Sequence, residues 1–186
     1  VPFHARRRDA LASMMISNCG LTSNNRLEVA RRLMDVVPVH SYGACLHNQD
    51  FPSTGDDTYS RQHYRTRNVE PLLSQYMFMV VFENANCDGY VTEKLWRAFR
   101  MGVVPLYLGA PDVRADFAPL PNSVIVVNDF RSMADLGHHL QYLASNETAY
   151  MELLTYKHRV VTHRFQDLWL TPGRGSWQCR LCDFVH

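Results

Sequence analysis

The sequence has no long apolar run and no excess of charge of either sign. None of its apolar stretches approaches the roughly 18 residues that a membrane-spanning helix needs. Lysine and arginine number 19 against 18 aspartates and glutamates in 186 residues. We therefore expect no broad electropositive face and no nucleic-acid partner. With 46% hydrophobic and 20% charged residues, the composition excludes a disordered or fibrous protein.

Several motifs of nucleotide and ester chemistry are also missing. The chain has no D-x-D triplet to anchor a metal on a nucleotide diphosphate, and Asp56-Asp57 does not form one. It has no P-loop, no G-x-G-x-x-G and no G-x-S-x-G. Zinc is not expected at Cys179-Arg-Leu-Cys182, because structural zinc needs four ligands and only His186 lies nearby. We expect no metal and no cofactor, so cations and a helix dipole would have to neutralise any bound diphosphate.

The start of the chain and the cysteines predict a fragment of a longer polypeptide. Val1-Pro2-Phe3-His4 contains neither a methionine nor an apolar segment, which predicts that a signal peptide or anchor is absent from this chain. Five cysteines are an odd number, so at least one is free or pairs outside the chain. Asn146-Glu147-Thr148 is an N-glycosylation sequon, a triplet that fits a secretory compartment but also arises by chance.

Apolar runs alternate with amphipathic segments along the chain, which predicts an α/β fold. We expect a Rossmann-like, doubly wound parallel sheet with helices on both faces, formed by residues 1–170 and followed by a Cys-x-x-Cys tail over 171–186. A long polar loop is expected over 44–68. The expected strands are 13–17, 36–42, 76–82, 103–108 and 123–127. One expected helix follows N-cap residue types at 22–24 and has an apolar stripe over 27–34. The other expected helices are 72–75, 90–101, 133–143, 147–158 and 161–170.

The richest candidate site follows the strand predicted over 76–82. Ligands of such sheets bind beyond the carboxyl ends of the strands. A helix beginning near Tyr90 would present unpaired first-turn amides, where a diphosphate binds. Lys94 supplies a charge for phosphate oxygens, and Glu93 offers a carboxylate for sugar hydroxyls. The pair suits a nucleotide-sugar, although residue type alone favours a solvated first-turn glutamate and an ordinary surface lysine.

Two more polar residues stand at strand exits. Arg26 opens the helix after the first strand, and its guanidinium can reach the same crevice. On residue type alone, an exposed arginine is the simpler interpretation. Asn84 directly follows the buried strand, where its amide either caps the turn or binds a ligand. Both interpretations stay open.

The segment around these residues resembles the donor-binding signature of the α1,3-fucosyltransferases, which transfer fucose from GDP-fucose with inversion. The resemblance spans roughly residues 12–158 and is strongest to the branch that includes the protein O-fucosyltransferases of the endoplasmic reticulum. Its central part is Phe82-Glu83-Asn84, Asp88-Gly89-Tyr90-Val91-Thr92-Glu93-Lys94-Leu95-Trp96 and Gly102-Val103-Val104-Pro105-Leu106-Tyr107-Leu108-Gly109. Further matches are Ser17-Asn18-Cys19 with Arg26, Val39-His40-Ser41-Tyr42-Gly43, Cys45-Leu46-His47-Asn48, Gly109-Ala110-Pro111 and Asp129-Phe130.

The resemblance implies the C-terminal, donor-binding half of a GT-B glycosyltransferase. Arg26 and Lys94 would neutralise the diphosphate without a metal, Asn84 and Tyr90 would line the phosphate and fucose side, and Glu93 would hold ribose or fucose hydroxyls. The family places its catalytic base in an N-terminal Rossmann-like half, so the base is expected outside this chain.

The same resemblance leaves the acceptor and the compartment open. The acceptor would be either a glycan, fucosylated α1,3 on GlcNAc, or a protein serine or threonine. The enzyme would lie in the lumen of the Golgi or the endoplasmic reticulum, as part of a type II membrane protein whose anchor is outside this chain. The alternatives are an inactive nucleotide-sugar-binding homologue, an isolated donor-binding module, or a metal-free transferase with another donor.

Two disulfide hypotheses complete the expectations. By resemblance to the family's C-terminal cysteines, Cys179 and Cys182 would form a disulfide with each other, or one of them would form a disulfide with the missing N-terminal half. Cys19 and Cys87 follow strands predicted to be neighbours, so a bond between them is a reasonable hypothesis.

Overall fold

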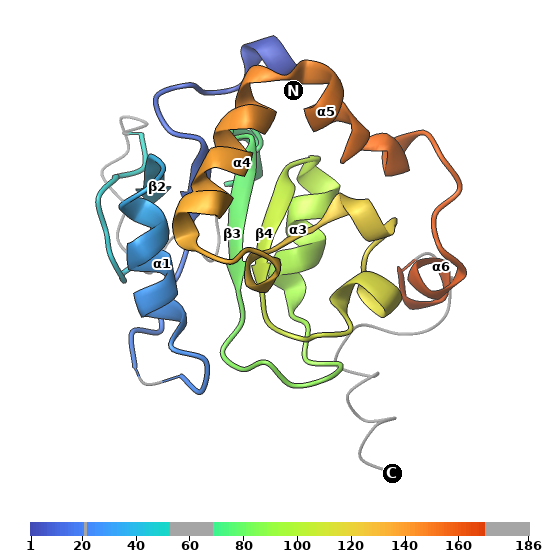
Figure 1. Ribbon diagram of the computed structural model, residues 1–186, viewed down its shortest axis with the longest axis horizontal. Coiled ribbons are helices and arrows are strands. Elements are labelled where there is room, and N and C mark those ends of the chain that lie inside the picture. Colours follow the sequence, from blue (N-terminus) through green and yellow to red (C-terminus); the bar gives the residue numbers. More distant parts are fainter. Residues whose placement is uncertain (21, 53–68, 170–186) are drawn as a thin grey trace.

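A parallel sheet of five strands forms the centre of the computed structural model, which describes residues 1–20, 22–52 and 69–169 (Figure 1). The sheet order is β2-β1-β3-β4-β5, and every pairing is parallel. The expected Rossmann-like α/β fold is therefore confirmed. The strands are β1 (Ala12–Met14), β2 (Val39–Ser41), β3 (Phe78–Phe82), β4 (Val104–Leu108) and β5 (Ile125–Val126).

Helices cover both faces of this sheet, as the doubly wound architecture requires. The α-helices are α1 (Arg26–Met34), α2 (Glu70–Leu73), α3 (Glu93–Met101), α4 (Met133–Ser145), α5 (Glu147–Glu152) and α6 (His163–Trp169). Short 3-10 or π turns are η1 (Phe3–Ala5), η3 (Val113–Phe117), η4 (Pro121–Ser123), η5 (Val127–Asp129) and η6 (Thr155–Lys157).

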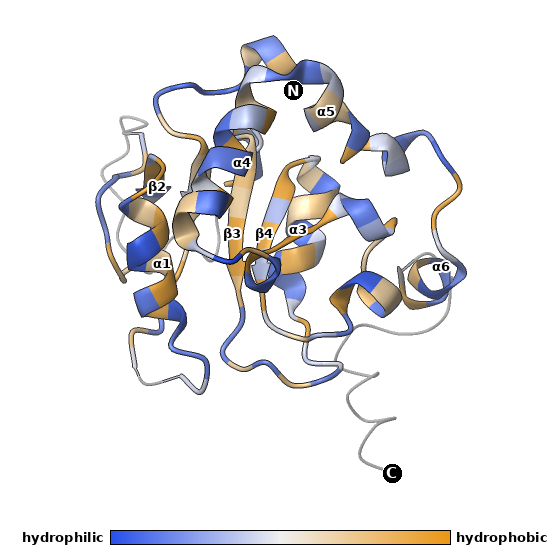
Figure 2. Cartoon of the chain, in the orientation of Figure 1, coloured by the Kyte–Doolittle hydropathy of each residue, from blue (hydrophilic) through white to orange (hydrophobic). Residues whose placement is uncertain are grey.

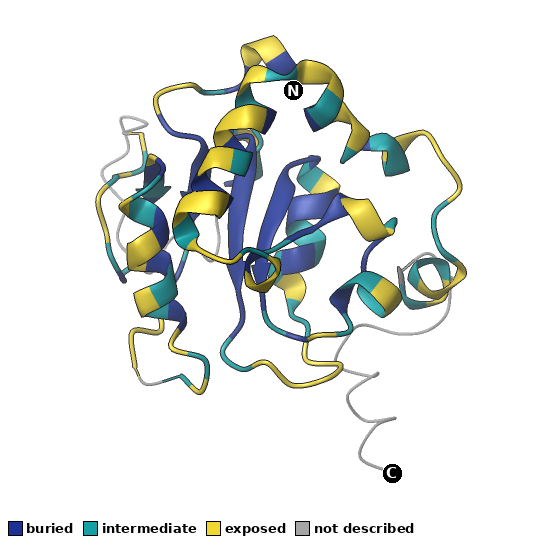
Figure 3. Cartoon of the chain, viewed as in Figure 1, coloured by how far each residue is buried: buried dark blue, intermediate teal, exposed yellow. Residues whose placement is uncertain are grey.

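The core has two layers because successive side chains of a strand point to opposite faces. On β3, Phe78, Val80 and Phe82 pack with α1 and α4, whereas Met79 and Val81 pack with α3. Every residue of β3 and β4 is buried. Figures 2 and 3 show the result: the central strands are apolar and buried, and the helices turn their polar, exposed sides outward.

Several elements are shorter than the sequence predicts. β1 ends at Met14 and β2 begins only after Pro38, since proline lacks the amide that a ladder needs. The helix expected from Tyr90 begins at Glu93 and ends, as expected, at Gly102, whose φ of 67° favours glycine. The segment expected to be helical over 147–158 divides into α5 and η6. Residues 53–68 of the polar loop and the tail over 171–186 lie outside the described residues.

Within those described ranges, no helix has both the length and the apolar character needed to cross a membrane.

Candidate functional site

The order in which strands are added to the sheet switches direction between β1 and β3. The chain runs from β1 outward to β2 and then crosses back to form β3 on the other side of β1. β1 pairs with β2 on one side and with β3 on the other, and ligands of open parallel sheets bind beyond the strands at such a switch point. A cavity of about 410 Å³ lies there, within the size range of small-molecule sites. Its lining residues are Met15, Ile16, Ser17, Asn18, Arg26, Val69, Glu70, Met79, Val80, Phe82, Asn84, Glu93, Lys94 and Arg97.

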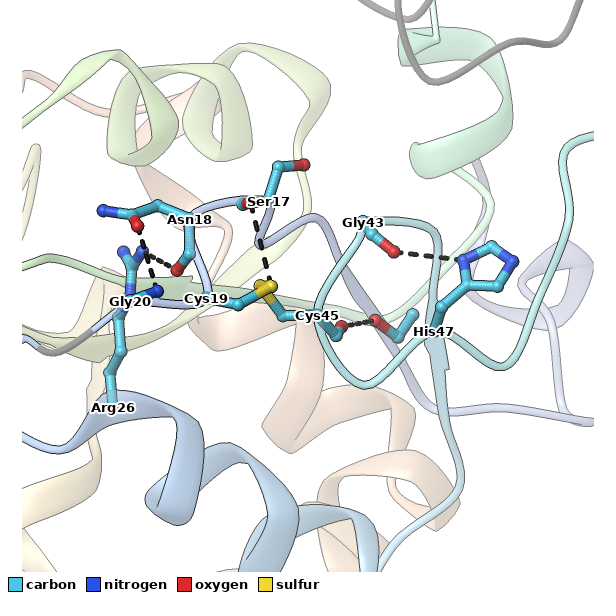
Figure 4. Close-up of a disulfide and its surroundings, with 9 residues drawn as sticks. Ser17, Asn18, Cys19, Gly20, Arg26, Gly43, Cys45 and His47 are labelled. Atoms are coloured by element: carbon cyan, nitrogen blue, oxygen red, sulfur yellow. Dashed lines mark hydrogen bonds between the residues drawn. A yellow bond between two sulfur atoms is a disulfide. The ribbon is translucent and has the colours of Figure 1, made fainter.

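Arg26 is buried at the first position of α1, with only 3% of its surface exposed. Its Nη1 donates to the carbonyl of Phe82 and its Nη2 to the carbonyl of Asn18, both at 3.0 Å; Figure 4 shows the bond to Asn18. The interpretation as an exposed arginine is wrong. The guanidinium instead joins the exits of β1 and β3 at the wall of the cavity.

Arg26 remains a cation in this environment. Burial lowers the pKa of its guanidinium, while the nearby Glu83 and Tyr90 raise it. An arginine begins with a pKa so high that it stays protonated. Its Nε is buried and has no hydrogen-bond partner among the described residues. The cavity wall therefore carries a fixed positive charge.

The beginning of α3 is held by a carboxylate that the sequence analysis did not single out. Glu83 is fully buried, and its Oε1 accepts hydrogen bonds from the amide and the hydroxyl of Thr92, each at 2.9 Å. Lys94 Nζ lies 3.4 Å from Glu83 Oε2 and donates to the Thr92 hydroxyl at 2.8 Å. The amide of Thr92, directly before the helix, therefore faces a protein carboxylate instead of a ligand.

The position of Glu83 in the sequence does indicate a buried carboxylate. It directly follows an all-apolar strand and precedes the turn into α3, and a carboxylate in that position cannot stay buried without donors. Nothing in the sequence alone names Thr92 and Lys94 as those donors, because nine or more residues separate them from Glu83.

Glu93 and Asn84 reach the same cavity from different elements. The side chain of Glu93 is 58% exposed, which places a carboxylate at the rim. Asn84 follows β3, and its Oδ1 is buried without a hydrogen-bond partner in the described part of the chain. Buried polar atoms are normally paired, so this oxygen favours a ligand-binding role for Asn84 over a turn cap.

Tyr90 does not line the cavity with the other four predicted residues. It precedes α3 and is 37% exposed. Burial lowers the pKa of the Arg26 guanidinium, and Tyr90 is one of the two groups that raise it. The role of Tyr90 in donor binding stays a prediction.

Arg97 is a cavity residue that the sequence analysis missed. It lies on α3 three residues after Lys94 and four after Glu93, and residues at these spacings share one helix face. That spacing was the available signal. Arg26, Lys94 and Arg97 together give the cavity three basic side chains.

A disulfide joins Cys19 to Cys45 beside this site (Figure 4). The predicted bond between Cys19 and Cys87 is therefore wrong, and Cys87 is free and exposed. The loop after β2 turns back over the exit of β1, where the amide of Cys45 donates to the carbonyl of Ile16 at 2.9 Å. Cys179 and Cys182, with their predicted bridge, lie outside the described residues.

The disulfide fixes the loop that carries Asn18. Its cysteines are 26 residues apart, and closing a loop of that length stabilises a fold by about 3–4 kcal/mol in the chain-entropy model. Disulfides persist in oxidising compartments, which agrees with a secreted or lumenal protein.

No group of three or more metal-ligating side chains that could hold an ion occurs in the described ranges. The metal-free expectation itself stays a prediction.

Comparisons with known proteins agree with this geometry. Residues 5–186 match the family model described as glycosyltransferase family 10 (fucosyltransferase), C-terminal part. Alpha-(1,3)-fucosyltransferase B of Drosophila melanogaster is 34% identical over 185 residues, which cover 91% of this chain and 41% of that protein. GDP-fucose protein O-fucosyltransferase 3 of Danio rerio is 38% identical, with coverages of 84% and 33%, and that of Homo sapiens is 36% identical, with coverages of 82% and 31%.

Solved structures of a fucosyltransferase are also similar to this chain. Crystal structures of an alpha1,3-fucosyltransferase with GDP and with GDP-fucose superpose with a TM-score of 0.60 at 29% identity. The superposition covers 79% of this chain and 38% of theirs. The chain thus spans about a third to two fifths of the length of these relatives.

Proposed function

Because this chain belongs to glycosyltransferase family 10, the fucosyltransferases, we propose that it is the donor-binding half of an enzyme that transfers L-fucose from GDP-fucose. The observation that carries the proposal is the cavity at the switch point of the sheet, where Arg26, Lys94 and Arg97 converge with the unpaired Asn84 Oδ1. Three cationic side chains in one cavity suit a diphosphate. The exposed carboxylate of Glu93 at the rim suits the hydroxyls of a sugar.

The proposed reaction breaks the bond between the anomeric carbon of fucose and the β-phosphate oxygen. The electron pair of that bond goes to the departing GDP, and an acceptor hydroxyl forms the new bond to the anomeric carbon with inversion. The proton of that hydroxyl goes to a base outside this chain. Cations already in place stabilise the growing charge on the diphosphate better than solvent does, so no metal is needed in this proposal.

The acceptor and compartment follow from the relatives only as proposals. The names of the relatives include an alpha-(1,3)-fucosyltransferase and a protein O-fucosyltransferase, so the acceptor is either a glycan, fucosylated α1,3 on GlcNAc, or a serine or threonine of a protein. The Cys19–Cys45 disulfide supports a lumenal location in the Golgi or endoplasmic reticulum. An N-terminal half and a membrane anchor would belong to the rest of the polypeptide.

The first test is stabilisation of the protein by GDP. A ligand at 100 times its Kd stabilises a folded protein by about 2.7 kcal/mol, so we expect GDP to raise Tm by about 5 °C or more in a domain of this size. Differential scanning fluorimetry with GDP and with UDP measures the effect. No shift with GDP in folded protein would contradict the proposed site, and an equal or larger shift with UDP would indicate another donor.

A further inference from the structure

Glu83 is a buried carboxylate to which the proposed transfer assigns no task. Its side chain has 1% exposure and leaves the end of β3 beside Gly109. A Cβ at position 109 would lie 2.9 Å from Glu83 Cγ, so glycine there leaves room for this side chain. Within the described ranges, Lys94 is the cation within salt-bridge distance of it. A buried charge is stable only with such partners.

The contacts of Glu83 restrict the most mobile cation of the cavity. Lysine carries its charge on a flexible stem with about 2 kcal/mol of rotamer entropy. The ammonium of Lys94 is held by the hydroxyl of Thr92 and by Glu83, and its side chain is only 27% exposed. Part of the rotamer entropy that the Lys94 side chain would lose on binding a diphosphate is therefore already lost in the free protein.

We propose that Glu83 is a positioning residue for fucosyl transfer, acting through Lys94. It holds the ammonium and the first turn of α3 at the cavity, so that the cation is in place when charge develops on the departing diphosphate. The inference rests on the proposed function. Because the negative charge of Glu83 also repels the donor, its removal affects turnover more than donor affinity.

The test is Glu83→Gln in the full-length protein, since glutamine keeps the size and one acceptor for Thr92. We expect kcat for transfer from GDP-fucose to fall about tenfold or more, while KM for GDP-fucose and Kd for GDP change by less than about threefold. A merely structural role would lower Tm without this split between kcat and KM. An unchanged kcat would overturn the inference.

A double-mutant cycle with Lys94→Ala shows whether Glu83 acts through Lys94. In the Lys94→Ala background, Glu83→Gln should cause no further loss of kcat. It should also raise the Tm of that background, because it removes a buried carboxylate that has lost its cation. The same fractional loss of kcat in both backgrounds would overturn the inference.

Two further measurements keep the inference testable. If Glu83→Gln does not fold, Thr92→Val removes only the bridging hydroxyl, and we expect kcat to fall about threefold with an unchanged KM; an unchanged kcat would overturn the inference. Wild-type protein that binds no GDP would instead overturn the proposed function, and this inference with it.

A separate observation concerns Asn146, at the junction of α4 and α5. Its Oδ1 accepts from the amide of Ala149 at 3.0 Å and its Nδ2 donates to the hydroxyl of Tyr142 at 3.1 Å. The neighbouring Glu147 and Thr148 are exposed, and the side chain of Tyr142 is 52% exposed. An N-linked sugar replaces one of the two Nδ2 hydrogens, so both bonds can persist in the modified protein.

This junction lies beyond the opposite end of the strands from the loop that joins β3 to α3 (Figure 1), and that loop and the start of α3 supply Asn84, Glu93 and Lys94 to the cavity. The hydroxyl of Tyr150, in α5, donates to the carbonyl of Met77 just before β3 at 2.7 Å, which places α5 at the amino ends of the strands. A glycan on Asn146 would therefore leave the donor cavity open. We infer that Asn146 is N-glycosylated: a lipid pyrophosphate carrier transfers its oligosaccharide to Nδ2, the bond from the sugar to phosphate breaks, and Nδ2 loses a proton.

Expression of the full-length protein in a eukaryotic secretory pathway tests this site. After treatment with peptide N-glycosidase F, the peptide containing Asn146 should carry an aspartate mass at that position. Thr148→Ala should abolish the modification and Thr148→Ser should keep it, and both variants leave the helix cap of Asn146 in place. An unmodified Asn146 peptide in the wild-type protein would overturn the inference.

Discussion

Replacing Lys94 by alanine is expected to lower kcat for fucosyl transfer about 100-fold, equivalent to about 2.7 kcal/mol of barrier, because one preorganised charge is lost from the departing diphosphate. The variant should also lose most of the rise in Tm that GDP produces. Both effects are expected because Lys94 lines the cavity and its ammonium is held by Thr92 and Glu83.

The measurement must separate ligand binding from stability. Lys94→Ala leaves the buried carboxylate of Glu83 without its cation, so the Tm of the free protein should fall as well. The difference in Tm with and without GDP is therefore the relevant quantity. Arg131→Ala is the matched control, because Arg131 is exposed and lies outside the cavity lining. A wild-type GDP shift and turnover in Lys94→Ala would contradict the assignment of this lysine.

Arg26→Ala is expected to have the larger effect on the fold. The substitution removes the donors to the carbonyls of Phe82 and Asn18, and hydrogen bonds to a charged group contribute about 1.5–3 kcal/mol each. We expect the free energy of unfolding to fall by roughly 3 kcal/mol, allowing for partial replacement by water. Binding of GDP should become undetectable, because the two strand exits separate and the fixed charge is lost.

Two variants distinguish the roles of Arg26. Arg26→Lys keeps the charge but cannot donate to both carbonyls in the same geometry, so its stability and its GDP affinity should lie between those of the wild type and the alanine variant. Arg32→Ala changes an exposed arginine of the same helix and should leave both unchanged. Urea unfolding and titration calorimetry with GDP measure the two quantities. Wild-type GDP affinity in folded Arg26→Ala would restrict Arg26 to a structural role.

The alternation of apolar and amphipathic segments was sufficient to predict the fold. The run before Glu83 is apolar at every position, which indicates a strand buried on both faces and hence a parallel sheet. The location of the site also followed from the chain, since Asn84, Glu93 and Lys94 lie between the end of that strand and the first turn of the next helix. Element ends were predicted less well: Tyr90 was placed in a helix that begins at Glu93.

The cysteines show a limit of such reasoning. In a parallel sheet the carboxyl ends of all strands lie on the same side. Cysteines that follow several strands are therefore candidates for a disulfide with Cys19. The path of the loop after β2, which returns over β1, selects Cys45. Loop paths depend on turns and packing that have no periodic signature in the sequence.

What the sequence alone determined is the class of fold, the order of its elements and the edge of the sheet where polar side chains gather, because these follow from hydrophobic periodicity and from the direction of parallel strands. Three features became known from the folded structure: Arg26 is buried and bridges the ends of two strands, Glu83 contacts Lys94, and Cys19 pairs with Cys45. Each of these contacts joins residues eight or more positions apart, beyond the spacing of helix or strand periodicity, so it depends on burial and on the path of the loops.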